Sequence, residues 1–183
     1  LGVRGGALLL AAWLPNLPWG EDGLMLRLVL LNVGAIAIVL AVHRRQAPIA
    51  RRLSYVSAVP AIAANAWYLV MVLIAVRRPV FPVPHPGFRL VFSSAALALW
   101  LSAALFGAVA IRIGAVTRWG ALTLTIGALL ASLGDSRWGF TTGPLGSLVE
   151  PLMLAGVFLV GVGWIWLGID VGTRRRPATV QPQ

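Results

Sequence analysis

Few side chains in this sequence could do chemistry, and those that could interrupt long apolar segments. Arg27 lies just inside one such segment and Glu150 lies just inside another. Ionisable side chains are costly inside a membrane, so each one marks a functional site by default. Arg27 and Glu150 are candidates for an ion pair at similar depth. We favour a structural role, as snorkelling side chains or as a tie between helices, over a role in proton or substrate binding.

Asn32 and Asn65 are amides placed within apolar segments. Asn65 follows Pro60 closely, and a proline frees a carbonyl group and bends a helix. A bent helix that carries Asn65 and Tyr68 would line a ligand cavity, whereas hydrogen bonds between helices would explain both amides without a ligand. We favour the hydrogen bonds between helices. The candidate ligand-binding residues are Arg27, Asn65, Tyr68 and Glu150.

Histidine and acidic residues form no catalytic or metal-binding motif in this sequence. His43 and His85 are predicted at opposite faces of a membrane about 30 Å thick, so they cannot ligate one haem. The chain has no cysteine, which excludes a disulfide framework and a thiolate metal site. The sequence therefore predicts no catalytic residue, no metal site and no cofactor, and it leaves bound lipid, quinone or pigment open.

The composition explains why so few polar groups are present. The 183 residues are 59% hydrophobic and 11% charged, whereas soluble domains carry roughly 25% charged residues. Such a chain cannot cover a water-facing surface. The net charge of +10 comes from arginines in short loops between apolar segments, which favours contact with anionic lipid headgroups over nucleic acid. We predict one transmembrane domain over 1–172 and a basic, disordered cytoplasmic tail over 173–183.

The apolar segments predict an all-α bundle of about six transmembrane helices, since one span needs about 20 mostly apolar residues. The segments are 5–19, 24–42, 56–76, 90–111, 119–134 and 148–169. The first resembles a signal peptide, but no small-x-small cleavage site follows it, so we expect a retained helix.

The arginines predict the orientation of these helices, because arginine near short loops resists translocation. With the N-terminus inside, the inner side holds most of them, including those of 44–52 and 174–176. The outer side keeps few, namely Arg77, Arg78, Arg89 and Arg137, with Arg27 just inside the second helix. Both termini are therefore predicted to be cytoplasmic. The use of arginine without any lysine is typical of a GC-rich bacterial genome, so we expect a multi-pass protein of a bacterial inner membrane.

Small residues recur at helix-packing spacing in the last three segments. Helices in lipid associate through close backbone approach at such residues. The packing candidates are Ser94, Ala98, Ser102, Gly107, Gly127 and Gly161, with further glycines at 156, 163 and 168. We expect these three helices to pack tightly together, although the same faces would also serve an interface with another subunit.

The predicted outer loop over 77–89 reads RRPVFPVPHPGFR and contains four prolines. Proline lacks an amide donor and favours an extended path, so we expect a stiff loop. A rigid connector would account for it, and so would the docking of a partner. The candidate docking residues are Phe81, His85, Phe88 and Arg89.

Three stretches together resemble a known group of proteins. They are HRRQA at 43–47, RIGAVTRWGALTLTIGALL at 112–130 and GVGWIWLGIDVGTRRR at 161–176. The chain resembles small, uncharacterised multi-helix integral membrane proteins of actinobacteria and Chloroflexi-type bacteria. The resemblance implies a helical fold in a bacterial inner membrane and transfers no catalytic residue.

Three functions fit these patterns. We favour a non-catalytic accessory or scaffold subunit of a larger bacterial membrane complex, which binds other membrane protein subunits through its small-residue helix faces and its proline loop. The alternative is a small carrier or channel for an apolar or amphipathic ligand, with a cavity near Pro60, Asn65, Tyr68 and Arg27. A membrane enzyme comes third, with Glu150 and Asp135 as its only acidic cluster.

Overall fold

The computed structural model describes residues 21–77, 86–133 and 146–173, and nearly all of these are helical. Within these residues four helices follow one another: α2 (Glu21–Arg77), α3 (Pro86–Ile113), α4 (Arg118–Leu133) and α5 (Gly146–Thr173). The prediction of an all-α chain is confirmed. Several predictions fall outside the described residues: the first helix over 5–19, Phe81, His85, Asp135 and the tail over 174–183.

The helices have the length and composition of membrane spans. Leu26–Ile74, Leu90–Ile113 and Leu148–Thr173 are long and apolar enough to cross a bilayer, and α4 is a shorter apolar helix. Large apolar side chains such as Val59, Leu154 and Phe158 are exposed on the outside of the fold, as lipid-facing residues are. The chain is therefore a membrane protein with transmembrane helices.

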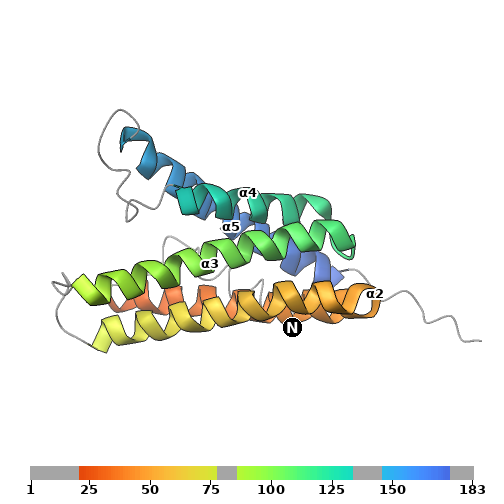
Figure 1. Ribbon diagram of the computed structural model, residues 1–183, viewed down its shortest axis with the longest axis horizontal. Helices are drawn as coiled ribbons and strands as arrows, with labels where there is room; N and C mark the ends of the chain where they lie inside the picture. Colours follow the sequence, from red (N-terminus) through yellow and green to blue (C-terminus); the bar gives the residue numbers. More distant parts are fainter. Residues whose placement is uncertain (1–20, 78–85, 134–145, 174–183) are drawn as a thin grey trace, which may run out of the picture.

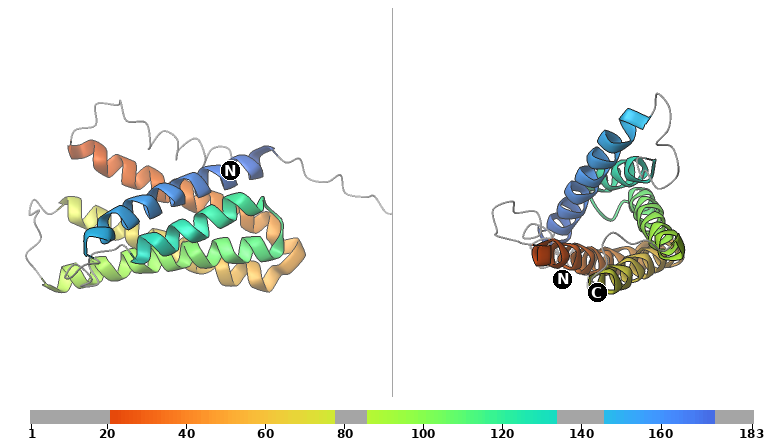
Figure 2. Two further views of the ribbon diagram at one scale, coloured as in Figure 1. Left: turned by 90° about the horizontal axis from the view of Figure 1, so that it is seen from above. Right: turned by 90° about the vertical axis from the view of Figure 1, so that its left-hand side faces the viewer.

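Helix α2 folds back on itself at Ala50. Its apolar part has 49 residues and would extend roughly 74 Å if it were straight, which is more than twice the hydrocarbon thickness of about 30 Å. Ala50 instead has non-helical angles, φ −146° and ψ 71°. The two halves, 21–49 and 51–77, lie side by side in Figures 1 and 2. The non-helical angles occur at Ala50 rather than at Pro60, where we expected a bend.

Polar contacts across the turn hold the two halves of α2 together. His43 Nδ1 lies 2.7 Å from Ser54 Oγ, whereas residues eleven apart in a straight helix are separated by roughly 16 Å. The Ser54 hydroxyl also lies 3.4 Å from Gln46 Oε1, as its donor. Gln46 and Ser54 are fully buried, so the turn has a polar core of its own.

The other helices complete a three-sided bundle. Seen end-on in the right-hand view of Figure 2, α2 forms one side, α3 the second, and α5 with α4 the third. Helix α4 packs between α3 and α5. Gly114, with a φ of 71°, ends α3 in the left-handed conformation, and its amide donates to Ala110 O at 3.1 Å. Glycine adopts this conformation readily, so the chain turns here into α4.

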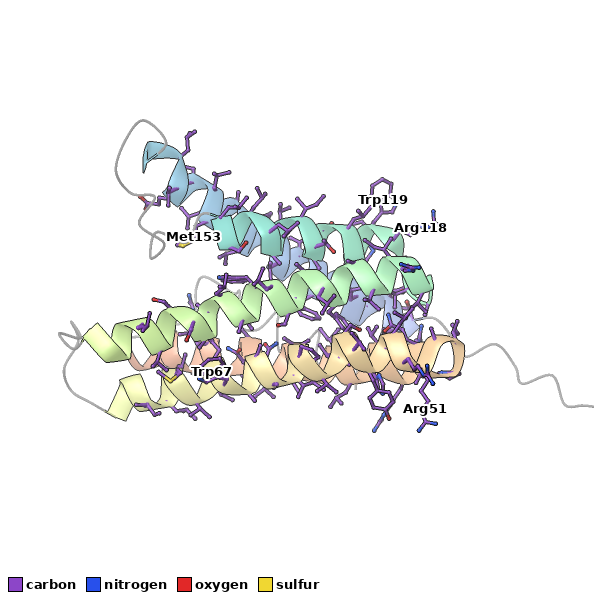
Figure 3. The ribbon with its side chains drawn as sticks, in the orientation of Figure 1. Arg51, Trp67, Arg118, Trp119 and Met153 are labelled. Carbon is purple, nitrogen blue, oxygen red and sulfur yellow. The ribbon has the colours of Figure 1, made fainter. Side chains whose placement is uncertain are left out.

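One end of the bundle gathers the arginines. The α2 turn carries Arg44, Arg45, Arg51 and Arg52, and the α3–α4 turn lies between Arg112 and Arg118. Figure 3 shows Arg51 and Arg118 at the same end of the molecule, with Trp67 and Met153 in the other half. We call this the arginine end and the opposite one the distal end. The half of the bundle nearest the arginine end is solidly packed, with Ile38, Phe106 and Leu167 all 0% exposed.

Candidate ligand-binding site

A cavity of about 290 Å³ lies between both halves of α2, α3 and α5. Its lining residues are Leu28, Leu31, Asn32, Ala35, Asn65 and Tyr68 of α2, Leu99, Trp100 and Ala103 of α3, and Met153, Val157, Val160, Gly161 and Trp164 of α5. Apolar and aromatic side chains with a few placed polar groups are typical of small-molecule sites. The cavity is therefore suited to an apolar or amphipathic molecule.

The fold-back of α2 brings the two cavity amides to the same depth. His43 and Ser54 are in contact across the turn. Asn32 precedes His43 by as many residues as Asn65 follows Ser54, so in antiparallel halves the two amides lie level with each other. Both line the cavity, one from each half. Residues far apart in the sequence thus supply the polar groups of a single site.

Each of the two amides donates a hydrogen bond within its own half of α2. The prediction that they bond between helices is therefore wrong. Asn32 Nδ2 donates to Leu28 O at 2.7 Å, and Asn65 Nδ2 donates to Ala61 O at 2.7 Å. Asn32 is 4% exposed and Asn65 is 3% exposed. Asn32 Oδ1 is buried without a hydrogen-bond partner among the described residues. A buried acceptor without a partner costs about 1–3 kcal/mol, which a ligand donor would recover.

Aromatic side chains close the cavity towards the arginine end. Trp164 is the lining residue of α5 nearest that end, and it is only 5% exposed. Its ring stacks on Phe106 of α3, with centroids 5.6 Å apart and an interplanar angle of 30°. Neither Trp164 nor Trp100 was predicted from the sequence to belong to the site. Their positions deep within apolar segments were the available signal, but depth alone does not separate lipid-facing from cavity-facing tryptophans.

The four candidate ligand-binding residues are only partly brought together. Asn65 and Tyr68 line the cavity, and the Tyr68 ring packs against Phe92 at 5.5 Å. Arg27 is half-buried beside the lining residue Leu28, and Glu150 is exposed one helical turn from Met153. The ion pair between Arg27 and Glu150 stays a prediction.

Glycines on α3, α4 and α5 lie where backbones meet. A Cβ atom added at Gly107 would lie 2.8 Å from Ala121 O, and one at Gly127 would lie 2.6 Å from Val160 N. Gly163 is as close, 2.6 Å from Leu124 N. Real Cβ atoms do not approach backbone atoms so closely, so these positions exclude any larger residue without helix separation.

The other packing candidates have different surroundings. Gly161 is buried and lines the cavity. Ser102 is buried and donates to Leu99 O of its own helix at 3.0 Å, and Ser94 likewise donates to Val91 O. Ala98 is half-buried. Of the docking candidates, Phe88 and Arg89 belong to the first turn of α3.

At the arginine end, hydrogen bonds of polar groups connect α2, α5 and the start of α4. Asp170 of α5 is 6% exposed, and its Oδ2 accepts a hydrogen bond from Thr117 N at 3.0 Å, directly before α4 begins. Arg45 of α2 donates to the carbonyl oxygens of Asp170 and Val171 at the C-terminus of α5. Asp170 was not predicted from the sequence to have a role. An acidic residue at a helix C-terminus opposes the helix dipole, and this conflict was the signal that it has another partner.

The described helices contain no cluster of side chains suited to bind a metal ion. Within 21–77, 86–133 and 146–173, no group of three or more His, Asp or Glu side chains could hold a metal ion. The resemblance to small bacterial membrane proteins stays a prediction, because no protein-family model, no curated protein and no solved structure matches this chain.

Proposed function

We propose that this protein binds an apolar or amphipathic small molecule inside the membrane and acts as a carrier for it. The observation that supports the proposal is the cavity of about 290 Å³ within the bundle. It is lined mainly by apolar and aromatic groups, and Asn32, which lines it, keeps a buried acceptor without a partner. Proteins bury unpaired polar atoms rarely, and those they keep need a specific explanation.

The packing favours a carrier over an open channel. Trp164 lines the cavity at the side of the arginine end, and its ring stacks on Phe106. Beyond them Ile38 and Leu167 are 0% exposed. A continuous pore would need an unfilled path through this core, so transport through the protein would require the helices to rearrange.

The accessory-subunit hypothesis has less support from the geometry. It relied on small-residue faces that would contact other subunits, but Gly107, Gly127 and Gly163 contact helices of the same chain. These faces are therefore occupied within the fold. The hypothesis now rests on the proline loop, most of which lies outside the described residues.

For the topology, we propose six transmembrane helices in a bacterial inner membrane, with both termini and the arginine end in the cytoplasm. The support is the positive-inside rule, together with the gathering of arginines at the two turns of one end. The lack of cysteine allows a direct test with single cysteines.

Ile49→Cys and Gly87→Cys are expected to react from opposite sides of the membrane. Ile49 is 66% exposed at the α2 turn, and Gly87 is exposed at the distal start of α3. A membrane-impermeant maleimide should label Ile49→Cys in inverted vesicles and Gly87→Cys in right-side-out vesicles. Labelling of both from one side, or in the reverse order, contradicts the proposed topology.

The binding proposal is tested by filling the cavity. Ala103 of α3 is buried and lines the cavity, whereas Ala108 of the same helix is exposed. We expect Ala103→Phe to lower the occupancy of a co-purified small molecule at least about tenfold, a loss of about 1.4 kcal/mol. Ala108→Phe adds the same ring outside and should leave the occupancy unchanged.

The measurement is native mass spectrometry of protein extracted in mild detergent, with each adduct identified by its mass. Thermal unfolding of both variants checks that the bundle is intact. A wild-type protein that carries no adduct beyond bulk phospholipid, or an Ala103→Phe variant that keeps it, would count against the proposal.

A further inference from the structure

The two carboxamides of the cavity present a particular kind of polar group. Asn32 and Asn65 both line the cavity, and both are more than nine-tenths buried. Each donates an Nδ2 hydrogen bond to the carbonyl four residues earlier, Leu28 O and Ala61 O respectively, at 2.7 Å. The halves of α2 therefore contribute matching groups in the same conformation.

These hydrogen bonds determine which way round each carboxamide lies. A backbone carbonyl oxygen can only accept, so the amide nitrogen must face it and the amide oxygen must face elsewhere. A flipped amide would place two oxygens against each other. The side-chain oxygen is thus the acceptor that each Asn has left to offer, beside the second hydrogen of its amide nitrogen.

The polar atom without a partner at this site is an acceptor, so it requires a hydrogen-bond donor. Asn32 Oδ1 has no hydrogen-bond partner in the described part of the chain, and an amide oxygen is satisfied only by an N–H or O–H group. Leu31, Val157 and Val160 of the lining offer none, and the donors that the lining does carry, on Tyr68, Trp100 and Trp164, are not hydrogen-bonded to this oxygen. A site with a buried, unpaired polar atom discriminates strongly against molecules that cannot pair with it.

We infer that the cavity is selective for a lipophile whose polar end is a hydroxyl group, which donates to the amide oxygen of Asn32. The apolar body of the molecule packs on the aliphatic and aromatic lining. Ethers, esters and quinones present only acceptors, so they bind less well at equal apolar size. This inference rests on the proposed binding function and specifies its ligand.

The test compares 1-decanol with decyl methyl ether, which keeps the chain and the oxygen but lacks the donor. Each probe is titrated, as a mole fraction of lipid, into wild-type protein in nanodiscs, and binding is measured from the rise in thermal unfolding temperature. We expect half-saturation at an at least tenfold lower mole fraction for the alcohol. Dioctanoylglycerol and its O-methyl ether, tested in the same way, distinguish a membrane lipid from a free alcohol as the hydroxyl source.

A variant locates the effect. Asn32→Leu is expected to bring the alcohol down to the affinity of the ether and to leave the ether unchanged. The wild-type comparison needs no variant and so remains decisive if this one unfolds. Equal binding of alcohol and ether overturns the hydroxyl inference and leaves the binding function standing. Binding of neither probe, together with no co-purified adduct, overturns both.

Discussion

Replacing Gly156 with alanine is expected to lower the free energy of unfolding by about 3 kcal/mol, at the upper end of the usual cost of overpacking. A Cβ atom at this position would lie 2.7 Å from Ala131 Cα and 2.7 Å from Gly127 O. These are backbone atoms that cannot rotate away, so α4 and α5 would have to separate along their contact. The size of the effect follows from that rigidity.

The matched control is Gly87→Ala, because nothing lies within 4 Å of a Cβ atom at Gly87. Alanine also favours helix over glycine by up to about 1 kcal/mol, so the control should be neutral or slightly stabilising. Unfolding in mild detergent, followed by heating or by added SDS, measures both variants. Equal stability of the two would show that the helix backbones are not in contact at Gly156.

Asp170→Ala has the second largest expected effect, a loss of about 2 kcal/mol, which is the upper end for removal of a helix N-cap. The change leaves Thr117 N–H without the acceptor that it now has at 3.0 Å, at the point where α4 begins. The start of α4 should come away from α5. Hydrogen exchange at the Thr117 amide is expected to speed up along with the fall in stability.

Two further substitutions identify the cause of that loss. Asp170→Asn keeps an acceptor oxygen at the same place and should lose less than half as much stability. Thr173→Ala removes an exposed hydroxyl that bonds only Ile169 O of its own helix, and it should be close to neutral. If Asp170→Ala were as stable as Thr173→Ala, the Thr117 bond would not contribute to the fold.

The helical class was predictable from the sequence for a simple physical reason. A backbone in lipid finds no water to bond, so apolar segments of spanning length must satisfy their own amides as helices. The predicted segments 24–42, 56–76, 90–111 and 148–169 each lie within a described helix. Their composition decided this outcome without any knowledge of their neighbours.

The site depends on contacts between residues of different helices, and the hydrophobic pattern of each separate segment does not predict such contacts. Asn65 and Tyr68 were predicted from their polarity within an apolar segment. Asn32 lies level with Asn65 only because α2 turns at Ala50, and the contact of His43 with Ser54 holds that turn. Trp164 enters the site because the assembled bundle places α5 beside the cavity, where its ring stacks on Phe106 of α3. A side chain inside an apolar segment shows that it is buried in the membrane, and its partner is decided only by how the helices assemble.

The described length of α4 has a consequence for the surrounding bilayer. Its 16 residues extend about 24 Å, less than the hydrocarbon thickness of about 30 Å, while α3 and α5 beside it have 28 residues each. The lipid-facing side of α4 carries Ile126, Leu129 and Leu133. Over its described residues, this flank therefore matches a thinner hydrocarbon layer than the flanks formed by α3 and α5 do.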